Sequence, residues 1–314
     1  MKLRLLTRMR TGFAAMLATL FMFPVLALAQ TNPANPARSA RSAVPVNMGV
    51  AKAELQPAAN DNGVVRMPDG RLVAPEIARI IARGELIVAV MSRDTVPFVY
   101  EVNGKLMGVD IELAQQVSAE LKVPIRFDRS AKTYDEVVEL VATGRADLGV
   151  SKLARTLKRA KYVLFSDPYM RLEHSLLINR LAFASVVRDQ SVAQAVRNFN
   201  GKISVLAGSA FEEFARRNFV KATIVPYPTW AKAVEAVKQG EAVAAYRDAI
   251  EVRTIMQSDP TLALTLRTVS FSDLESFLCV MVGPRDFVLQ SFVNEIIASR
   301  VEKLTVNGLL KKMK

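Results

Sequence analysis

The amino-acid sequence predicts an α/β protein of two lobes, each a mainly parallel sheet flanked by helices. Three observations support this class. Short apolar runs alternate with helical spacings, the alternation occurs in two series of similar length, and the 314 residues are 51% hydrophobic and 23% charged. Alternating strands and helices favour parallel sheets that helices cover on both faces, and the composition is ordinary for a globular protein.

The first series begins at residue 75. Apolar residues at helical spacing lead to Arg83, and Gly84 ends the helix. Leu86–Val90 follows as a continuous apolar run, which is typical of a strand buried on both faces. Asn103-Gly104 between two apolar stretches predicts a hairpin. The series then continues as helix 110–121, strand 124–128, helix 134–144 and strand 146–151.

The second series consists of strand 202–208, helix 211–219, strand 223–227, helix 230–240 and strand 242–248. We expect residues 174–180 to join the lobes, and the strand and long helix within 276–304 to return to the first lobe. The expected boundaries are 75–175 for the first part of lobe 1, 176–264 for lobe 2 and 265–314 for the return. Because open α/β sheets bind ligands at the carboxyl ends of their strands, the predicted site lies between the lobes.

Residues 1–29 have the order of a secretory signal peptide. Four basic residues without an acid precede an apolar run that closes with Ala27-Leu28-Ala29. We expect cleavage after Ala29 and a periplasmic protein. A retained membrane anchor is the alternative, because the apolar run is nearly long enough to span a bilayer. Residues 30–74 begin rich in Pro, Ala, Asn and Ser, which predicts a disordered or loosely ordered leader.

Charge and reactive residues exclude several classes of function. Removal of the signal peptide takes away four basic residues and lowers the net charge from +12 to +8. The basic residues are dispersed without an aromatic-basic module, so we expect no nucleic-acid binding. One cysteine and one histidine exclude a zinc protein. Nucleotide-binding glycine motifs and the G-x-S-x-G nucleophile pattern are absent. We therefore expect no cofactor, no metal and no catalytic residue, and a solvated or packed role for His174.

Three polar residues at strand ends are candidates for ligand binding. Arg159 follows strand 146–151 and could clamp a carboxylate or be a surface cation. Ser209 opens a helix and could seat an anion or cap that helix. Asp248 ends a strand and could hold an ammonium group or cap the next helix. Together these partners describe a zwitterion, as an α-amino acid is, whereas Trp230 is expected to pack in the core.

Four blocks of sequence, 84–121, 146–169, 201–214 and 242–248, resemble in this order the periplasmic amino-acid-binding proteins of ABC importers, solute-binding protein family 3. The resemblance runs from about residue 80 to the carboxyl terminus. Its most specific part is the combination of GVDIELA with an arginine followed by FSDPY. The resemblance implies the two-lobed periplasmic-binding-protein fold of type II, with a hinge between the lobes.

The resemblance also implies roles for individual residues. Arg159 matches the arginine that clamps the ligand carboxylate, and Asp248 matches the acid that holds the α-amine. The other matches are Thr156 three residues before the arginine, Ser151 at the strand end, the ligand-covering aromatics Tyr134 and Phe98, and Ser209 at the helix-start anion seat.

Four residues depart from the family pattern, among them Ala210, which lacks the hydroxyl that some relatives have just after the helix-start serine. Ala154 stands where many members have a Ser or Thr that also binds the carboxylate. Lys152 and Arg247 place cations at positions that are often small or neutral. These two cations could meet an acidic ligand side chain, or they could face water.

By resemblance we expect a monomeric binding protein, not an enzyme, that captures an amino acid by lobe closure and delivers it to the membrane subunits of an ABC permease. Two alternatives stay open. A dehydratase of the cyclohexadienyl type on the same scaffold would need a carboxylic general acid in the cleft, where Glu173 is poorly sited. A ligand-sensing module for a receptor is the other. The sequence does not identify the amino acid.

Overall fold

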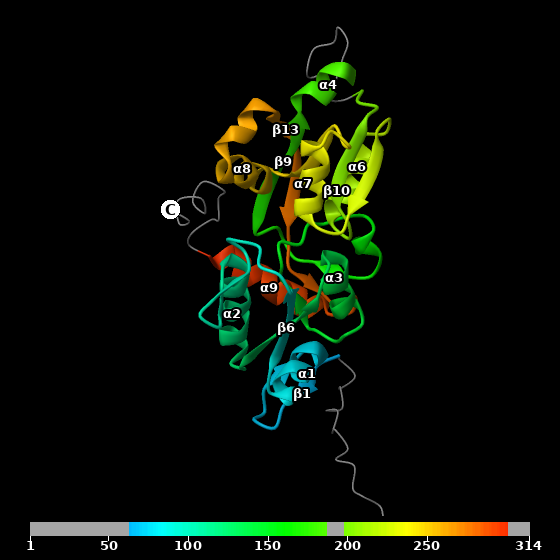
Figure 1. Cartoon of the computed structure of the whole chain (residues 1–314). Coiled ribbons are helices and arrows are strands. Elements are labelled where there is room, and N and C mark those ends of the chain that lie inside the picture. The colour runs from blue at the N-terminus through cyan, green and yellow to red at the C-terminus, as the bar shows by residue number, and fades with distance from the viewer. Residues whose placement is uncertain (1–62, 187–197, 301–314) are drawn as a thin grey trace, which may run out of the picture. The chain divides into compact units, whose positions relative to one another are not determined.

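A computed structural model describes residues 63–186 and 198–300, all within the compact unit Glu54–Lys314 (Figure 1). The predicted signal peptide and residues 30–62 of the predicted leader lie outside the described residues. Two five-stranded sheets with flanking helices form this unit, so the predicted two-lobed α/β class is confirmed.

The first sheet has the strand order β6-β3-β7-β14-β8. β3 is buried at all of its positions, as its continuous apolar sequence predicted, and it pairs in parallel with both β6 and β7. β14 runs antiparallel to both of its neighbours, so it is the one strand that opposes the others. The strands are β3 (Leu86–Met91), β6 (Ile125–Ala131), β7 (Leu148–Gly149), β8 (Leu164–Phe165) and β14 (Met281–Val282).

The second sheet has the order β11-β10-β12-β9-β13. β10, β11 and β12 pair in parallel, whereas β9 is antiparallel to both β12 and β13. Again one strand opposes the others. The strands are β9 (Met170–Asn179), β10 (Lys202–Leu206), β11 (Thr223–Tyr227), β12 (Ala244–Asp248) and β13 (Leu266–Leu278).

Two long strands carry the chain between the sheets. The segment 174–180, which we expected to join the lobes, lies mostly inside β9 in the interior of the second sheet. This apolar run pairs with β12 on one side and with β13 on the other, so the connection between the lobes is itself a strand of the second sheet. The chain therefore leaves the first sheet near Tyr169, six residues before the expected boundary at 175, and returns after Leu278, thirteen residues after the one at 265. Figure 1 shows α9 (Phe287–Ser299) beside α2 (Val109–Leu121) of the first lobe.

The helices begin and end at residues with recognisable capping chemistry. Gly84 ends α1 in the left-handed conformation, and its N–H donates to the carbonyls of Ile80 and Ile81. Thr133 and Thr229 accept hydrogen bonds from the N–H three residues on, at the starts of α3 and α7. The remaining elements are α1 (Pro75–Arg83), α3 (Tyr134–Ala142), α4 (Arg180–Val186), α6 (Ala210–Asn218), α7 (Trp230–Lys238), α8 (Ala249–Ser258), the 3₁₀ turns η1 (Arg159–Lys161) and η2 (Pro260–Leu264), and the predicted hairpin β4 (Tyr100–Val102) with β5 (Lys105–Met107).

The end of the predicted leader is ordered, which corrects the prediction for residues 63–74. β1 (Val65–Arg66) and β2 (Leu72–Val73) form a small antiparallel ribbon. Val65 and Met67 are buried against Ala78 of α1. The prediction for residues 30–74 rested on their average composition, in which the Pro and Asn of the preceding stretch outweigh these few apolar residues.

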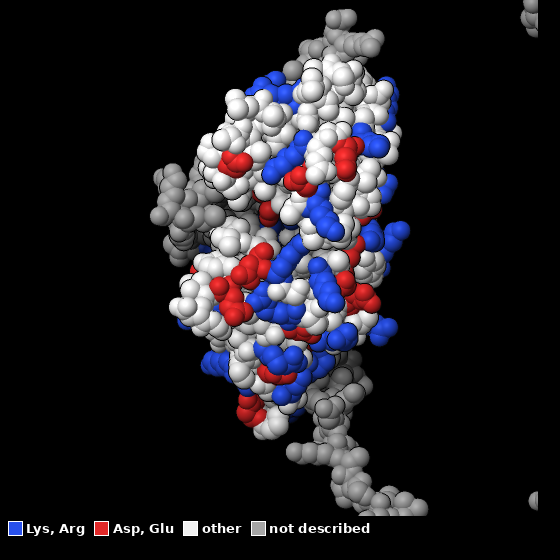
Figure 2. Space-filling model, viewed as in Figure 1, with Lys and Arg blue, Asp and Glu red and all other residues white. Residues whose placement is uncertain are grey.

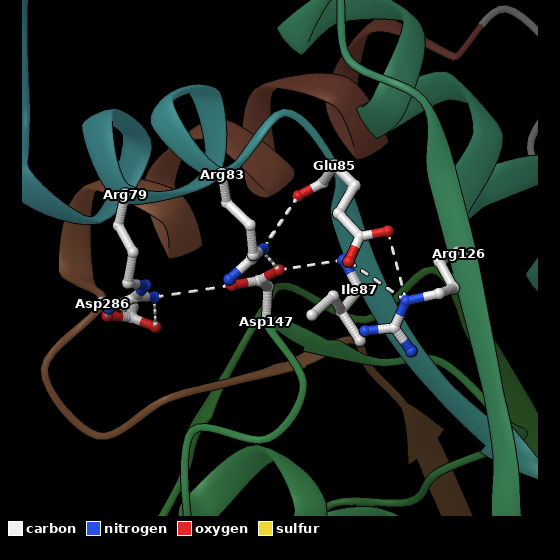
Figure 3. Close-up of polar contacts among 7 residues, drawn as sticks. All are labelled: Arg79, Arg83, Glu85, Ile87, Arg126, Asp147 and Asp286. Atoms are coloured by element: carbon white, nitrogen blue, oxygen red, sulfur yellow. Dashed lines mark hydrogen bonds and ion pairs between the residues drawn. The ribbon is translucent and has the colours of Figure 1, made fainter. Parts of the chain in front are cut away.

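An ion-pair cluster ties α1 to the first sheet and to the β14–α9 turn (Figure 3). Asp147 is 3% exposed, pairs with Arg83, and accepts a hydrogen bond from the Ile87 N–H at 2.9 Å. Arg79 lies 3.7 Å from Asp147 and 3.0 Å from Asp286. The cluster fixes the start of β7, whose following loop carries Lys152 and Arg159.

Candidate ligand-binding site

The loop after β7, the end of β12 and the start of α6 meet in a small cavity between the two sheets. Its free volume is about 20 Å³, which is room for roughly one water molecule. Side chains of the protein therefore fill most of the place where a ligand is expected. The cavity is lined by Tyr134, Lys152, Ala154, Arg159, Leu172, Ser209, Ala210, Phe211, Arg247, Asp248, Ser276 and Leu278.

Four of the seven predicted site residues line this cavity: Tyr134, Arg159, Ser209 and Asp248. Thr156 lines a neighbouring hollow of about 250 Å³, which Arg159 and Ser209 also border. The structure places Ser151 and Phe98 outside both linings. The Ser151 hydroxyl accepts a hydrogen bond from Met91 N–H at 3.0 Å. Phe98 is fully buried, and the Lys152 Nζ lies 5.1 Å from the centroid of its ring.

Arg159 is 2% exposed and is held by groups of its own lobe. Its Nε and Nη2 donate to Asp135 Oδ1 at 3.2 and 2.9 Å, and its Nη1 donates to Ala154 O at 2.9 Å. Thr156 caps the turn by accepting from Arg159 N–H at 3.2 Å. Burial would raise the pKa of Asp135, but Arg159 and Lys158 lower it below its usual value. Arg159 is therefore a buried, oriented cation rather than a surface one.

Asp248 caps α8 and is paired across the site with Lys152. Its side chain accepts from Glu251 N–H at 3.2 Å, and Lys152 Nζ lies 2.9 Å from its Oδ2. Lys152 Nζ also lies 2.8 Å from Glu251 Oε1. Burial would raise the pKa of Glu251, but Lys152 and Arg247 lower it to about 2. The lysine ammonium thus occupies the position in which an amino-acid ammonium was expected.

Arg247 is 3% exposed and lies among aromatic rings. Its Nη2 donates to the Tyr134 hydroxyl at 3.1 Å, while its Cζ lies 5.6 to 5.8 Å from the ring centroids of Tyr134, Trp230 and Phe211. Both Lys152 and Arg247 are buried and line the cavity. The expectation that they could simply face water is therefore wrong, because carboxylates of the opposite lobe hold Lys152 and aromatic rings of both lobes surround Arg247.

Ser209 stands at the start of α6, but its side chain does not cap the helix. Its hydroxyl donates to Leu206 O at 2.7 Å instead. Gly208 before it adopts φ +64, and a Cβ there would lie 3.0 Å from the Thr133 side chain. Asp135 N–H donates to Gly208 O at 3.1 Å, so this turn is a point of backbone contact between the lobes.

Sequence reasoning missed two residues that hold the lobes together. Glu251 is the second carboxylate on Lys152. Glu213 of α6 accepts hydrogen bonds from the Leu157 and Lys158 N–H groups at 3.0 and 3.3 Å. Glu251 lies one helical turn after Asp248, and that spacing could have identified it. Nothing in the sequence pairs Glu213 with a loop more than fifty residues away.

His174 is packed, not solvated. It is 1% exposed on β9, it hydrogen-bonds with the Tyr246 hydroxyl and, through Nε2, with Ser276 Oγ at 2.7 Å, and its ring stacks on Phe214. Burial lowers the pKa of His174 to about 4. Glu173 is exposed on the opposite face of the strand, so the two residues do not form an acid–base pair.

The His174 pKa predicts a contribution to stability that depends on pH. An unfolded histidine titrates near 6.5, so below that pH the unfolded state binds a proton that the folded state refuses. We expect the contribution of His174 to fall by about 1 to 2 kcal/mol as the pH falls from 6.5 to 5. Burial raises the pKa of Asp110 to about 6, which acts in the opposite direction over the same range.

Urea unfolding of the wild type and His174→Gln at pH 6.5 and 5 separates the two groups. Because Asp110 is present in both proteins, the stability difference between them should shrink at pH 5. A difference that stays constant would contradict the lowered histidine pKa.

Residues 63–186 and 198–300 contain no cluster of His, Cys, Asp and Glu suited to a metal ion. Within the same ranges no helix is long and apolar enough to cross a membrane. On the face shown in Figure 2, Lys and Arg are interspersed with Asp and Glu rather than gathered into one uninterrupted basic patch.

Comparison with known proteins places the chain in a family. Residues 87–312 match the model of the bacterial extracellular solute-binding proteins, family 3, and the chain belongs to that family. Among curated proteins it is similar to cyclohexadienyl dehydratase of Pseudomonas aeruginosa, with 26% identity over 69% of this chain and 78% of the relative. It is also similar to the L-cystine-binding protein TcyJ of Escherichia coli, with 24% identity over 74% of this chain and 84% of the relative.

Solved structures give the same fold. An ancestral amino-acid-binding protein, described as a precursor of cyclohexadienyl dehydratase, is 28% identical with a TM-score of 0.58 and covers 75% of this chain and 98% of its own. An amino-acid ABC transporter substrate-binding protein of Streptococcus pneumoniae, bound to L-arginine, is 26% identical with a TM-score of 0.57, over 74% of this chain and 94% of its own.

Proposed function

We propose that this protein captures an α-amino acid between its two lobes and delivers it to the membrane subunits of an ABC permease. The observation that carries the proposal is that Arg159 of the first lobe and Asp248 of the second line one cavity, both almost fully buried. A guanidinium matches a carboxylate bidentately, and a carboxylate matches an ammonium group. A ligand that bridges the two residues would favour the closed lobes, because only closure offers both contacts.

Lys152 has a part in this mechanism. In the closed arrangement described here its ammonium lies 2.9 Å from Asp248 and 2.8 Å from Glu251. A ligand ammonium that binds Asp248 would displace Lys152 from that carboxylate, and Glu251 would keep it paired. The exchange replaces one buried ion pair by another, so the ligand amine would enter without leaving a buried charge uncompensated.

Family and relatives support the rest of the proposal. The family is extracellular by its description, one relative is named an L-cystine-binding protein, and a solved relative is an amino-acid transporter substrate-binding protein bound to L-arginine. With the predicted signal peptide these names support export to the periplasm and transport rather than chemistry on the ligand. In this proposal the protein acts as a monomer, and its closed form docks on the permease.

A dehydratase is the second candidate, because one relative is named cyclohexadienyl dehydratase. That reaction would need a protonated carboxyl group facing the cavity. Glu251 has a pKa of about 2 and stays ionised at neutral pH. The raised pKa of Asp110 belongs to a fully buried carboxyl group that accepts from Lys152 N–H and the Tyr169 hydroxyl, outside the cavity lining. These surroundings favour binding, and an assay of prephenate turnover tests the alternative.

A thermal-shift screen of the protein against the common amino acids tests the proposal. A true ligand should stabilise the folded state by about 2.7 kcal/mol at a hundredfold excess over its dissociation constant. Asp248→Asn should remove the response, whereas Asp259→Asn, a matched change at an exposed cap, should keep it. If no amino acid raises the melting temperature, or if Asp248→Asn responds like the wild type, the proposal is wrong.

A further inference from the structure

Arg247 is a buried cation whose hydrogen-bonding capacity is largely unused. It is 3% exposed, and its one hydrogen bond among the described residues runs from Nη2 to the Tyr134 hydroxyl. Its Nε and Nη1 have no hydrogen-bond partner there. Buried donors are nearly always satisfied in folded proteins, since an unpaired one is costly. These two donors on a cavity-lining side chain therefore indicate an acceptor that the protein itself does not supply.

The nearby carboxylates do not satisfy Arg247, because Lys152 holds them. Arg247 lies 3.6 Å from Asp248 and 3.8 Å from Glu251, beyond hydrogen-bonding distance, whereas Lys152 lies 2.9 and 2.8 Å from the same two acids. Of the charged residues that line the cavity, Lys152, Arg159 and Arg247 are cations and Asp248 is the single acid. Arg159 is paired with Asp135 and Lys152 with Asp248 and Glu251, so among the described residues Arg247 is the cavity-lining cation without a hydrogen-bonded acid. The site therefore favours a ligand that brings a negative group to Arg247.

The surroundings of Arg247 suit a carboxylate. The guanidinium is bordered by the rings of Tyr134, Phe211 and Trp230, which exclude water and offer no strong acceptor. The Trp230 Nε1 donor is also buried without a hydrogen-bond partner in the described part of the chain. In such an apolar setting a carboxylate gains strong charge-assisted bonds from the guanidinium. A ligand ammonium or guanidinium there would meet like charges instead.

We propose that Arg247, supported by Lys152, binds a second carboxylate of the ligand, so that the captured solute is an acidic amino acid. The inference rests on the proposed function: Arg159 takes the α-carboxylate, Asp248 the α-amine, and Arg247 the side-chain carboxylate. A neutral amide of the same shape offers one acceptor oxygen where a carboxylate offers two, and its NH2 group would face an unsatisfied donor, so the site discriminates against it.

Isothermal titration of the protein exported and purified from a bacterial periplasm, refolded from denaturant to remove carried ligand, tests the inference. The probes are L-glutamate, L-aspartate, L-glutamine, L-arginine and glutarate. We expect an acidic amino acid to bind at least about tenfold more tightly than glutamine, and arginine to bind weakest. Arg247→Gln should reduce the affinity for the acidic ligand by about thirtyfold or more and bring its ratio to glutamine close to one.

Two further variants keep a folding defect from imitating the result. Arg253→Gln removes the same charge from the exposed side of α8 and should leave the affinities unchanged. Glu251→Gln removes the acid that keeps Lys152 paired once the ligand amine has taken Asp248, so it should lower the affinity for both glutamate and glutamine but keep the preference for glutamate. A preserved preference in this weakened variant would show that a general loss of affinity does not imitate the effect of Arg247→Gln.

The possible outcomes separate the inference from the proposed function. If a neutral or basic amino acid binds most tightly, or if Arg247→Gln keeps the glutamate-to-glutamine ratio, the inference is overturned and amino-acid binding stands. If glutarate binds as tightly as glutamate, the carboxylate site at Arg247 is supported, but the α-amine part of the proposed function is wrong. If none of the probes binds, the inference is overturned, and the thermal-shift screen against the other amino acids decides the proposed function.

Discussion

Replacing Arg159 by glutamine should abolish ligand binding at concentrations that saturate the wild type. The arginine is buried and oriented by Asp135 and Ala154 O, so its removal would leave the ligand carboxylate buried without a cation. Truncating one partner of such a pair costs about 2 to 5 kcal/mol, which is roughly 30-fold to several-thousand-fold in the dissociation constant. Isothermal titration with the amino acid found in the thermal-shift screen measures the effect.

Lys158→Gln is the matched control for Arg159. Lys158 Nζ lies 2.6 Å from Asp135 Oδ2, so this change also takes a cation from Asp135, but the Lys158 side chain is 60% exposed and lies outside the small cavity. We expect its affinity to stay within about threefold of the wild type. If Arg159→Gln also binds within that range, Arg159 only holds Asp135 and does not clamp the ligand.

Asp147→Asn should cause a large loss of stability. The carboxylate is 3% exposed, pairs with Arg83 and accepts the Ile87 N–H (Figure 3). The amide keeps the shape but loses the charge opposite two arginines, and a lost charge-assisted bond is costly when its partner stays in place. Because Arg83 is partly exposed to solvent, we expect a decrease of about 2 to 4 kcal/mol in the free energy of unfolding, measured by urea denaturation.

Glu85→Gln provides the comparison within the same cluster. Glu85 pairs with Arg126 at 3.1 Å, but the two side chains are 32% and 51% exposed. Exposed pairs contribute about 0 to 1 kcal/mol, so this variant should be nearly as stable as the wild type. If Asp147→Asn and Glu85→Gln lowered the free energy of unfolding by the same amount, burial would not explain the contribution of the Asp147 ion pair to stability.

Closure of the lobes in the described structure relies on contacts that the protein makes with itself. Lys152 with Asp248, Glu213 with the N–H groups of the 157–158 turn, and Arg247 with the Tyr134 hydroxyl all cross the site. The ammonium group of Lys152 on Asp248 carries the same charge as the amine that a ligand would place there. A solute therefore competes with Lys152 for Asp248, and the net gain on binding depends on how well Glu251 retains the lysine.

The alternation of strands and helices, the hairpin at Asn103 and the polar residues at the carboxyl ends of several strands could be predicted from the sequence. Each depends on local patterns: apolar period, turn residues and capping side chains. Arg159, Ser209, Tyr134 and Asp248 could be placed near the site for the same reason, because strand ends in open α/β sheets meet at one edge. The segment 174–180 was expected to join the lobes. It lies within β9, one of the two strands that connect the sheets, and the sequence did not show that it would also pair on both sides inside the second sheet.

Contacts between distant segments came only from the tertiary structure. The sequence by itself determined the lobes, the order of their elements and the presence of cations at 152 and 247, since these follow from residue type and spacing. Tertiary structure decided that Lys152 would neutralise Asp248 and Glu251, that Ser151 and Phe98 would turn away from the cavity, and that Arg247 would be buried with unused donors. The physical reason is that burial and ion pairing depend on which surfaces meet across nearly a hundred residues of chain, and no local pattern records that meeting.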